Sequence, residues 1–378
     1  MSEPSERAAR MALSAVVDAG DPALAALVAD VGPIEAWELV RRNALGEPVG
    51  RRAAEIDHRQ IAVLARHYRI RFVVPGDEEW PAGLDDLRFL APIQRRAGVP
   101  VGLWLRGPGH LGQLCERAVS MVGSRAATAY GTQTASELAM DLAGRGTTVV
   151  SGGAYGIDTA AHRGALAGEG ATVAVLANGV DVPYPKGNAP LLTGIARDHV
   201  IVSELPPGET PSRVRFLARN RIIAAMARGT VVVEAAERSG ARNTASWTVD
   251  CGRQLMAVPG PVYSAMSSGP HQLVRSGQAS LVTSAAEVLE LVAGIGECLI
   301  APPRGSARAT DDLDERQLAV FEALPSRSRA AVGDVALRAG LSVPVTLAEL
   351  AGLERLGLAE GDEQGWRTSR ATEARSAG

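Results

Sequence analysis

The spacing of hydrophobic residues changes near residue 117, and this change separates regions of different predicted structure. In residues 5–70 apolar residues recur every three or four positions, as in Leu24, Leu27 and Val28, and Gly-Asp-Pro and Gly-Pro turns interrupt the runs. This spacing places apolar side chains on one face of an α-helix. We therefore predict a module of short helices over residues 1–70. Small helical modules with such turns can contact a DNA backbone, but packing is their more common role.

Between residues 117 and 261, short apolar runs rich in β-branched residues alternate with glycine-rich turns and helical patterns. Six runs have this form: residues 119–122, 148–150, 172–176, 200–204, 230–234 and 255–258. Two earlier runs, residues 72–75 and 101–107, also have the pattern of strands. Strands that are apolar on both faces and alternate with helices form a parallel sheet with crossover helices. The predicted core is an α/β fold, a Rossmann-like doubly wound parallel sheet over residues 71–296, with residues 71–116 as its N-terminal extension.

The pattern changes again after the core. Residues 297–312 are rich in proline, glycine, serine and alanine, which is typical of a linker. Three amphipathic helices are expected next, at residues 317–324, 331–339 and 345–356, followed by a small hairpin from residues 357–360 and 365–367. Three helices and a hairpin make a winged helix, predicted over residues 313–370, with residues 371–378 as a disordered tail. Residues 311–367 hold eleven acidic residues and six arginines, which favours protein docking over duplex reading.

The composition is that of an ordinary soluble protein, with 46% hydrophobic and 21% charged residues among 378. Four charged residues lie within the first ten positions, and no segment offers about 18 uninterrupted apolar residues. We therefore expect a cytoplasmic protein with no membrane partner. Cys115, Cys251 and Cys298 lack CxxC spacing, so they indicate neither a disulfide framework nor a zinc site and are expected to be core thiols.

The charge pattern points to a local site for polyanions. A formal net charge of −3 argues against a protein that binds nucleic acid over its whole surface. Residues 204–253, however, hold eight arginines against five acidic residues. Four of these arginines surround Phe216 in the sequence: Arg213, Arg215, Arg219 and Arg221. A ring among guanidinium groups can stack a base while the cations neutralise the flanking phosphates. The alternative is a core phenylalanine at a helix start, with arginines that coat a solvated face.

Glycine-rich turns follow the predicted strands, notably Gly123-Ser124-Arg125, residues 151–156 and Ser239-Gly240. In a parallel doubly wound sheet all such turns meet at the carboxyl edge of the strands. Their N–H groups and the adjoining helix N-termini attract phosphate. Lys186, the only lysine in the chain, lies in a Tyr-Pro loop after another strand. Neither the turn after residues 119–122 nor the turn after residues 148–150 fits GxGxxG, and GxxxxGKS/T is absent, which disfavours ordinary NAD binding and P-loop hydrolysis.

Candidate catalytic chemistry is sparse. Asp158 and His162 stand four apart, on one helix face, but no third metal ligand accompanies them, so a structural pair is the better interpretation. Ser203-Glu204, at a strand end, could hold a ribose or a base edge. No GxSxG elbow occurs. We therefore predict no catalytic residue, no metal and no cofactor.

With these motifs in place, the sequence resembles the bacterial DNA-processing protein family DprA, also called Smf, over nearly its whole length. The matching residues are Met121-Val122-Gly123-Ser124-Arg125 with Thr128, Tyr130 and Gly131; Ser151-Gly152 with Gly156-Ile157-Asp158 and residues 161–166; Gly179 with Tyr184-Pro185 and Asn188; Ser203-Glu204; Phe216 with residues 219–223; Val233-Glu234 with Ser239-Gly240; and Val258-Pro259-Gly260. So many matches in the same order are highly specific.

The resemblance implies a non-enzymatic protein that binds single-stranded DNA, forms homodimers, protects incoming strands and helps to load RecA recombinase in natural transformation. It also implies a SAM-like or helix-hairpin-helix-like N-terminal module. Carried over by motif, Arg125, Lys186, Arg219 and Arg221 would bind backbone phosphates, Phe216 would contact or stack a base, and Asn220 would help to shape the pocket. The full expected nucleic-acid site is Gly123, Ser124, Arg125, Gly153, Lys186, Phe216, Arg219, Asn220, Arg221, Ser239 and Gly240.

Two departures from the family pattern concern this site. Leu217-Ala218 stands where the family often has a proline after the phenylalanine, and Tyr155 stands where an arginine is common. Loss of that arginine would weaken one phosphate contact, whereas the tyrosine would add stacking; both outcomes are open at this point.

Two other functions remain alternatives. One is a Rossmann-type nucleotide-processing enzyme, similar to the nucleoside monophosphate phosphoribohydrolases, although their Pro-Gly-Gly-x-Gly-Thr-x-x-Glu motif is missing. The other is an interaction scaffold with no affinity for nucleic acid. Release of base from nucleotides would identify the first, and absence of oligonucleotide binding would identify the second.

Overall fold

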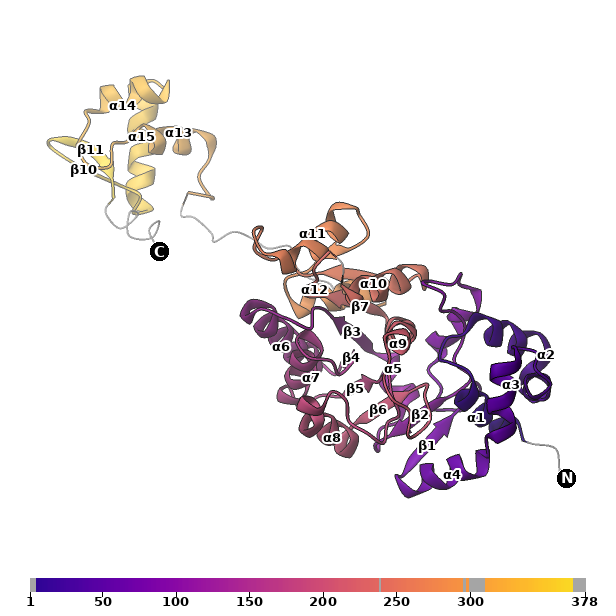
Figure 1. Ribbon diagram of the computed structural model, residues 1–378. Coiled ribbons are helices and arrows are strands. Elements are labelled where there is room, and N and C mark those ends of the chain that lie inside the picture. Colours follow the sequence, from indigo (N-terminus) through magenta and orange to yellow (C-terminus); the bar gives the residue numbers. More distant parts are fainter. Residues whose placement is uncertain (1–4, 238, 295–296, 299–309, 370–378) are drawn as a thin grey trace. The chain divides into compact units, whose positions relative to one another are not determined.

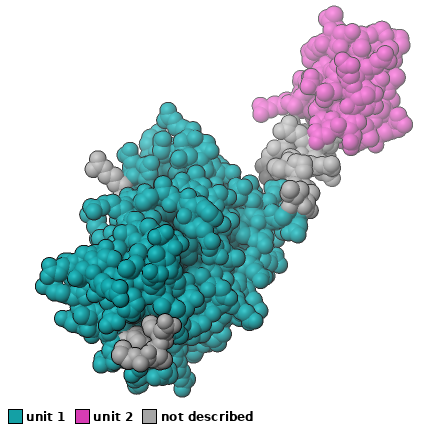
Figure 2. Space-filling view, turned by 90° about the vertical axis from the view of Figure 1, so that its right-hand side faces the viewer, with its two compact units in different colours: residues 1–300 teal, residues 301–378 magenta. Residues whose placement is uncertain are grey.

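The computed structural model describes residues 5–237, 239–294, 297–298 and 310–369. The chain forms two compact units, Met1–Ile300 and Ala301–Gly378 (Figures 1 and 2). The predicted helical module and the sheet thus belong to the same unit. Among the described residues no single helix is long and apolar enough to cross a membrane; one pair in the second unit, Val332–Ala339 with Val343–Arg355, passes on length and composition but is bent by 100°.

Four helices open the first unit: α1 (Glu6–Val16), α2 (Pro22–Arg41), α3 (Glu47–Glu55) and α4 (His58–His67). Ser5 and Asp21 cap α1 and α2 by accepting hydrogen bonds from backbone N–H groups of the first turn. Within α2, Gly32 has a φ of 78° and precedes Pro33, so the helix is kinked there. The helices bury Leu13 and Trp37 in a common core, as the helical spacing predicts.

The first unit contains a nine-stranded sheet. Its strands are β1 (Ile70–Val73), β2 (Leu103–Arg106), β3 (Ala118–Val122), β4 (Thr148–Ser151), β5 (Thr172–Val175), β6 (Val200–Ser203), β7 (Gly229–Val232), β8 (Gln254–Ala257) and β9 (Ser280–Leu281). The order is β1-β2-β6-β5-β4-β3-β7-β8-β9. Strands β3 to β9 pair in parallel, so the predicted parallel core is confirmed. Strand β2 pairs antiparallel with both β1 and β6, which the sequence pattern did not indicate.

Helices cover both faces of the sheet. Alternate residues of β3 point to opposite faces: Val119 and Met121 pack with α6 (Ala129–Gly144), α7 (Ile157–Ala167) and α12 (Ala285–Val292). Ala118 and Val122 pack in the other core, with α9 (Arg213–Ala225) and α10 (Gly240–Asp250). Figure 1 shows this three-layer arrangement. The remaining elements of the unit are α5 (Leu111–Glu116), α8 (Ala189–Asp198), α11 (Ser268–Arg275), and the 3-10 helices η1 (Ala82–Phe89), η2 (Lys186–Asn188) and η3 (Ala265–Ser267).

The strand order reverses between β3 and β7. From β3 the chain adds β4, β5 and β6 in one direction, then returns to place β7 on the other side of β3. The connections after β3 and β7 therefore leave the sheet in opposite directions. Open α/β sheets form a crevice at the carboxyl edge of such a switch point.

The second unit contains three helices and a hairpin: α13 (Glu315–Ala323), α14 (Val332–Ala339), α15 (Val343–Arg355), β10 (Ala359–Asp362) and β11 (Gly365–Thr368). These elements lie within a few residues of the predicted ones. Asp314 and Gln317 form a capping box at the start of α13. Gly340 ends α14 with a φ of 67°, a left-handed conformation that glycine adopts without strain. Val335, Leu350 and Leu353 form the core of the unit.

Candidate nucleic-acid interface

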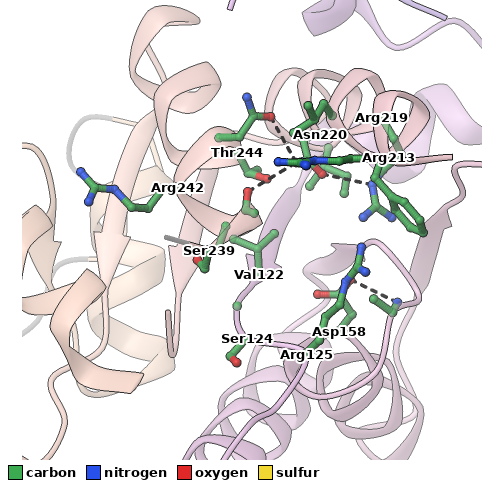
Figure 3. A pocket seen from close by; sticks show the side chains of 18 of the residues that line it. Val122, Ser124, Arg125, Asp158, Arg213, Arg219, Asn220, Ser239, Arg242 and Thr244 are labelled. Atoms are coloured by element: carbon green, nitrogen blue, oxygen red, sulfur yellow. Dashed lines mark hydrogen bonds between the residues drawn. The ribbon is translucent and has the colours of Figure 1, made fainter. Parts of the chain in front are cut away.

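A cleft of about 1070 Å³ opens at the carboxyl edge of the sheet, at the switch point between β3 and β7 (Figure 3). We call it the switch-point cleft. Three segments supply most of its wall: the turn after β3, the exposed side of α9, and the N-terminal turn of α10. The lining residues used below are Gly123, Ser124, Arg125, Asp158, Tyr184, Arg213, Phe216, Arg219, Asn220, Ser239, Gly240, Arg242 and Asn243. Residues from five separate parts of the chain thus meet at one opening.

The turn after β3 is fixed by Glu234, which follows β7. Its carboxylate accepts hydrogen bonds from Thr128 N at 2.9 Å and from Thr128 Oγ1 at 2.6 Å, and its carbonyl accepts one from Ser124 N at 2.6 Å. A Cβ at Gly123 would lie 2.7 Å from that carbonyl, so only glycine fits. Glu234 therefore holds together the two loops that border the switch point. In the sequence, Glu234 is recognisable only as part of the Val233-Glu234 motif, which does not indicate this role.

Phe216 lies on α9 and is partly buried. The Arg125 guanidinium carbon is 4.4 Å from the centre of its ring, and that of Arg219 is 5.8 Å away. The Tyr184 ring centre is 6.3 Å from that of Phe216. The expected grouping of an aromatic ring with guanidinium groups is present, although Arg125 comes from another element.

Arg219 forms part of the cleft floor. Its side chain is buried, and Nη1 donates to the carbonyls of Gly152 at 2.6 Å and Val175 at 2.7 Å, at the ends of β4 and β5. Burial lowers the pKa of Arg219 to about 10, while the nearby Asp158 opposes that change. At neutral pH the guanidinium is therefore charged and held in one position. Burial raises the pKa of Asp158, and the charge of Arg219 acts in the opposite direction.

Two asparagines connect α9 to the start of α10. Asn220 Nδ2 donates to Asn243 Oδ1 at 3.1 Å and to the Gly240 carbonyl at 3.4 Å. Ser239 is the N-cap residue of α10, yet its side chain makes no capping hydrogen bond and its Oγ is buried without a partner among the described residues. The N-terminal N–H groups of α10 thus border the cleft. Such groups favour an anionic oxygen.

Several cations at this edge form no ion pair with the described residues. Within the described part of the chain, no ion pair is found for Arg125, Arg213, Arg242 or Lys186. Arg215, by contrast, pairs with Glu209 at 2.6 Å. Figure 3 shows Arg125 and Arg213 on different sides of the opening, so an anion in the cleft would meet cations from two elements. Arg242 belongs to this set but was absent from the expected site.

Two expected residues lie beside the cleft and do not line it. Lys186 is exposed, in η2. The Gly153 carbonyl accepts a hydrogen bond from Asn188 Nδ2 at 3.0 Å, and Gly153 has a φ of 70°. Tyr155, the departure noted in the sequence, accepts a hydrogen bond from the backbone N–H of Gly187 at 3.3 Å. The Lys186 loop and the turn after β4 therefore contact each other next to the cleft.

The expectation that Arg221 binds phosphate is corrected by the structure. The Arg221 side chain is 1% exposed, and its two terminal nitrogens donate to the Glu204 carboxylate at 2.9 and 2.6 Å. The reason is helical phase: residues two apart on a helix point about 200° apart, so Arg219 and Arg221 cannot face the same cleft. Because Glu204 is committed to this pair, the expected role of Ser203-Glu204 in holding a ribose or a base edge is also corrected.

Asp158 and His162, four apart on α7, have different surroundings: Asp158 lines the switch-point cleft, whereas His162 does not. His162 is fully buried, and its Nδ1 lies 2.7 Å from Thr172 Oγ1. Burial lowers the pKa of His162 to about 3, so the ring is neutral. No cluster of three or more potential metal ligands occurs in the described ranges.

Comparisons with known proteins agree with the motifs. Residues 71–293 match the family model described as DNA recombination-mediator protein A. The putative DNA processing protein DprA of Mycobacterium tuberculosis is 47% identical, covering 98% of this chain and 96% of the relative. The X-ray structure of DprA from Streptococcus pneumoniae has a TM-score of 0.62 and 31% identity over 75% of this chain and 96% of that one. DprA of Helicobacter pylori, whose structure is described as showing a unique single-stranded DNA binding mode, has a TM-score of 0.51 and 26% identity over 59% of this chain and 95% of that one.

Proposed function

Since the chain belongs to the DNA recombination-mediator protein A family, we propose that it is a DNA-processing protein that binds single-stranded DNA in the switch-point cleft. One observation carries this proposal: the cleft combines the Phe216 ring with the cations Arg125 and Arg213, which form no ion pair among the described residues. A strand in the cleft would place a base against the ring and its flanking phosphates beside the cations.

The same geometry favours single strands over duplex DNA. Bases of a single strand are free to stack on an aromatic side chain, whereas those of a duplex are already stacked on each other. Each phosphate that meets a cation releases counterions and steepens the salt dependence by about 0.7 in log–log slope for single strands. Little base readout is expected, because stacking accepts every base.

By the same family relation we propose finer roles. The protein would protect single strands, help to load RecA recombinase in natural transformation, act as a homodimer, and work by binding rather than catalysis. We also propose that residues 1–70 act as a SAM-like or helix-hairpin-helix-like module beside the core. Residues 313–370 would be a winged helix that docks to protein, because α15 and its neighbours carry an acidic excess.

Fluorescence anisotropy of labelled single-stranded and duplex oligonucleotides, across a salt series, tests this proposal. The wild type should bind the single strand more tightly, and Arg125→Ser with Arg213→Ser should weaken binding and flatten the salt dependence. Arg197→Ser is the matched control, because Arg197 ends α8 at the opposite edge of the sheet and is 77% exposed. Absence of single-strand binding at low salt would remove the proposal. Release of base from nucleoside monophosphates would instead favour a nucleotide-processing enzyme.

A further inference from the structure

Four of the five tyrosines in the chain follow carboxyl ends of strands in the parallel sheet. They are Tyr130 after β3, Tyr155 after β4, Tyr184 after β5 and Tyr263 after β8. Their exposed fractions are 41%, 49%, 41% and 100%. The tryptophans Trp37, Trp80, Trp104 and Trp247 are all buried. Apart from Tyr68 and Phe89, the exposed tyrosine and phenylalanine side chains in the described part of the first unit therefore follow the carboxyl ends of strands.

The tyrosines follow the order of the strands along that edge. Strands β5, β4, β3, β7 and β8 are consecutive neighbours, so the segments that carry the tyrosines leave the sheet in the order Tyr184, Tyr155, Tyr130, Tyr263. Four strand spacings of about 4.8 Å make an edge of about 19 Å. That length holds up to about six nucleotides at the 3.4 Å spacing of stacked bases. The switch-point cleft, between β3 and β7, lies within this row.

Contacts divide the row into two groups. Tyr184 lies beside Phe216, and Tyr155 contacts the Lys186 loop, so both belong to the side of the cleft described above. On the other side, Tyr130 Oη donates to the Pro259 carbonyl at 2.5 Å. Pro259 begins the turn that carries Tyr263 after β8. Tyr130 and the Tyr263 turn are thus in direct contact and form a second aromatic group.

A cation lies between the two groups. Arg242 is in the first turn of α10, which follows β7, the strand between β3 and β8. In Figure 3 its side chain extends away from Arg213 and Arg219. Its Nη1 donates to the Glu237 carbonyl at 3.1 Å, and the described residues offer it no acidic partner. A phosphate that has passed Phe216 on the way to β8 would therefore meet a free guanidinium charge.

We propose that Tyr263, supported by Tyr130, is a second base-stacking site, and that a single strand held at Phe216 continues over the ends of β7 and β8. The ligand class is a nucleobase of single-stranded nucleic acid, without preference for one base, because stacking needs only the face of the ring. This inference rests on the proposed function and extends it from one stacking site, at Phe216, to a binding path that also includes Tyr263.

The competing explanation is that Tyr263 serves a protein contact. Tyrosine tolerates water because its ring is apolar and its hydroxyl is polar, and Val262 beside it is 77% exposed. A fully exposed ring contributes almost nothing to folding, so its removal leaves the fold intact. Substitution at Tyr263 therefore separates the two explanations without a loss of structure.

The test compares single strands of about 4 and about 12 nucleotides by fluorescence anisotropy, with wild type, Tyr263→Ala and Tyr263→Phe. Tyr263→Ala should weaken binding of the longer strand about fivefold to about 150-fold, the equivalent of one lost stacked base. The short strand, which Phe216 can hold alone, should be much less affected. Tyr263→Phe, which keeps the ring, should bind the longer strand with wild-type affinity. The matched control is Tyr68→Ala, because Tyr68 precedes β1 at the opposite edge and is 38% exposed.

The outcomes separate this inference from the proposed function. If wild type binds neither strand, the proposed function itself fails. If wild type binds and Tyr263→Ala binds the longer strand as tightly as wild type, the second stacking site is overturned while the cleft remains. A loss of the same size in Tyr68→Ala would also overturn it, because the effect would then not depend on position.

Discussion

Replacing Arg221 should destabilise the fold without removing a contact to DNA. Arg221 forms two hydrogen bonds with Glu204, and the two side chains are only 1% and 9% exposed. The Arg221 Nε also lies 3.4 Å from the Ala97 carbonyl, and its guanidinium packs against Gly20 in the turn before α2. The Arg221–Glu204 pair therefore connects α9, which carries Phe216 and Arg219 of the cleft, to the turn before α2 and to the carboxyl end of β6.

The size of the destabilisation follows from the burial of both Arg221 and Glu204. Arg221→Met leaves the Glu204 carboxylate buried without its partner, which typically costs about 3–5 kcal/mol of unfolding free energy. Glu204→Leu should lower the unfolding free energy by a similar amount, because it leaves the Arg221 guanidinium buried without its partner. The double variant, with an apolar pair in place of the ion pair, should recover much of the loss, since well-packed apolar replacements are often close to neutral. The non-additivity is the signature of a direct interaction.

Urea denaturation of the full chain, followed by fluorescence of the buried tryptophans, measures these effects. Arg197→Met is the control, because Arg197 pairs with Asp198 at the surface and should leave the unfolding midpoint unchanged. Under conditions where each variant is folded, single-strand affinity should stay close to that of the wild type. The reasoning is wrong if Arg221→Met unfolds at the wild-type urea concentration, or if it is fully folded and loses single-strand binding.

Three further predictions concern the cleft and the core beneath it. If the Phe216 ring stacks a base, Phe216→Ala should weaken single-strand binding by about 1–3 kcal/mol, which is about fivefold to about 150-fold. An unchanged dissociation constant would show that the ring does not stack a base. Arg213→Ser should lower the log–log salt slope of single-strand binding by about 0.7, and an unaltered slope would show that Arg213 meets no phosphate. His162, whose pKa burial lowers from 6.5 to about 3, binds a proton more readily in the unfolded chain, so its contribution to stability is complete above about pH 6.5 and is lost as the pH falls toward 3. Between pH 7 and pH 5 the wild type should therefore lose about 2 kcal/mol more unfolding free energy than His162→Gln in urea titrations, and equal losses would contradict the assignment.

The parallel sheet could be predicted because its strands are short runs of β-branched residues between glycine turns, and because every residue of β3 to β8 except Gln254 is buried. Strand direction at the edge could not be predicted in the same way. Nothing in the composition of residues 101–107 distinguishes an antiparallel neighbour of β6 from a parallel one. Strand β9 was missed because it has only two residues, both exposed.

The sequence predicted which types of residue gather at the candidate site better than it predicted which way their side chains point. Glycine turns at the carboxyl edge and the aromatic ring on α9 follow from pattern and topology. The difference between Arg219 and Arg221 depends on which side of α9 faces the cleft, and that side is set by tertiary packing against Ala97 and Glu204. Arg242 and Glu234 were missed for a related reason, since their roles depend on the contact between the loops after β3 and β7.

Photochemical cross-linking locates the bound single strand on the protein. A single strand that contains bromodeoxyuridine at every position would be irradiated with the full-length protein, and the linked peptides would be identified by mass spectrometry. Binding in the switch-point cleft predicts links to Phe216 and Tyr184, and its extension over β8 predicts a link to Tyr263. Links confined to residues 310–369, or to the amino edge around Tyr68 and Arg197, would contradict it.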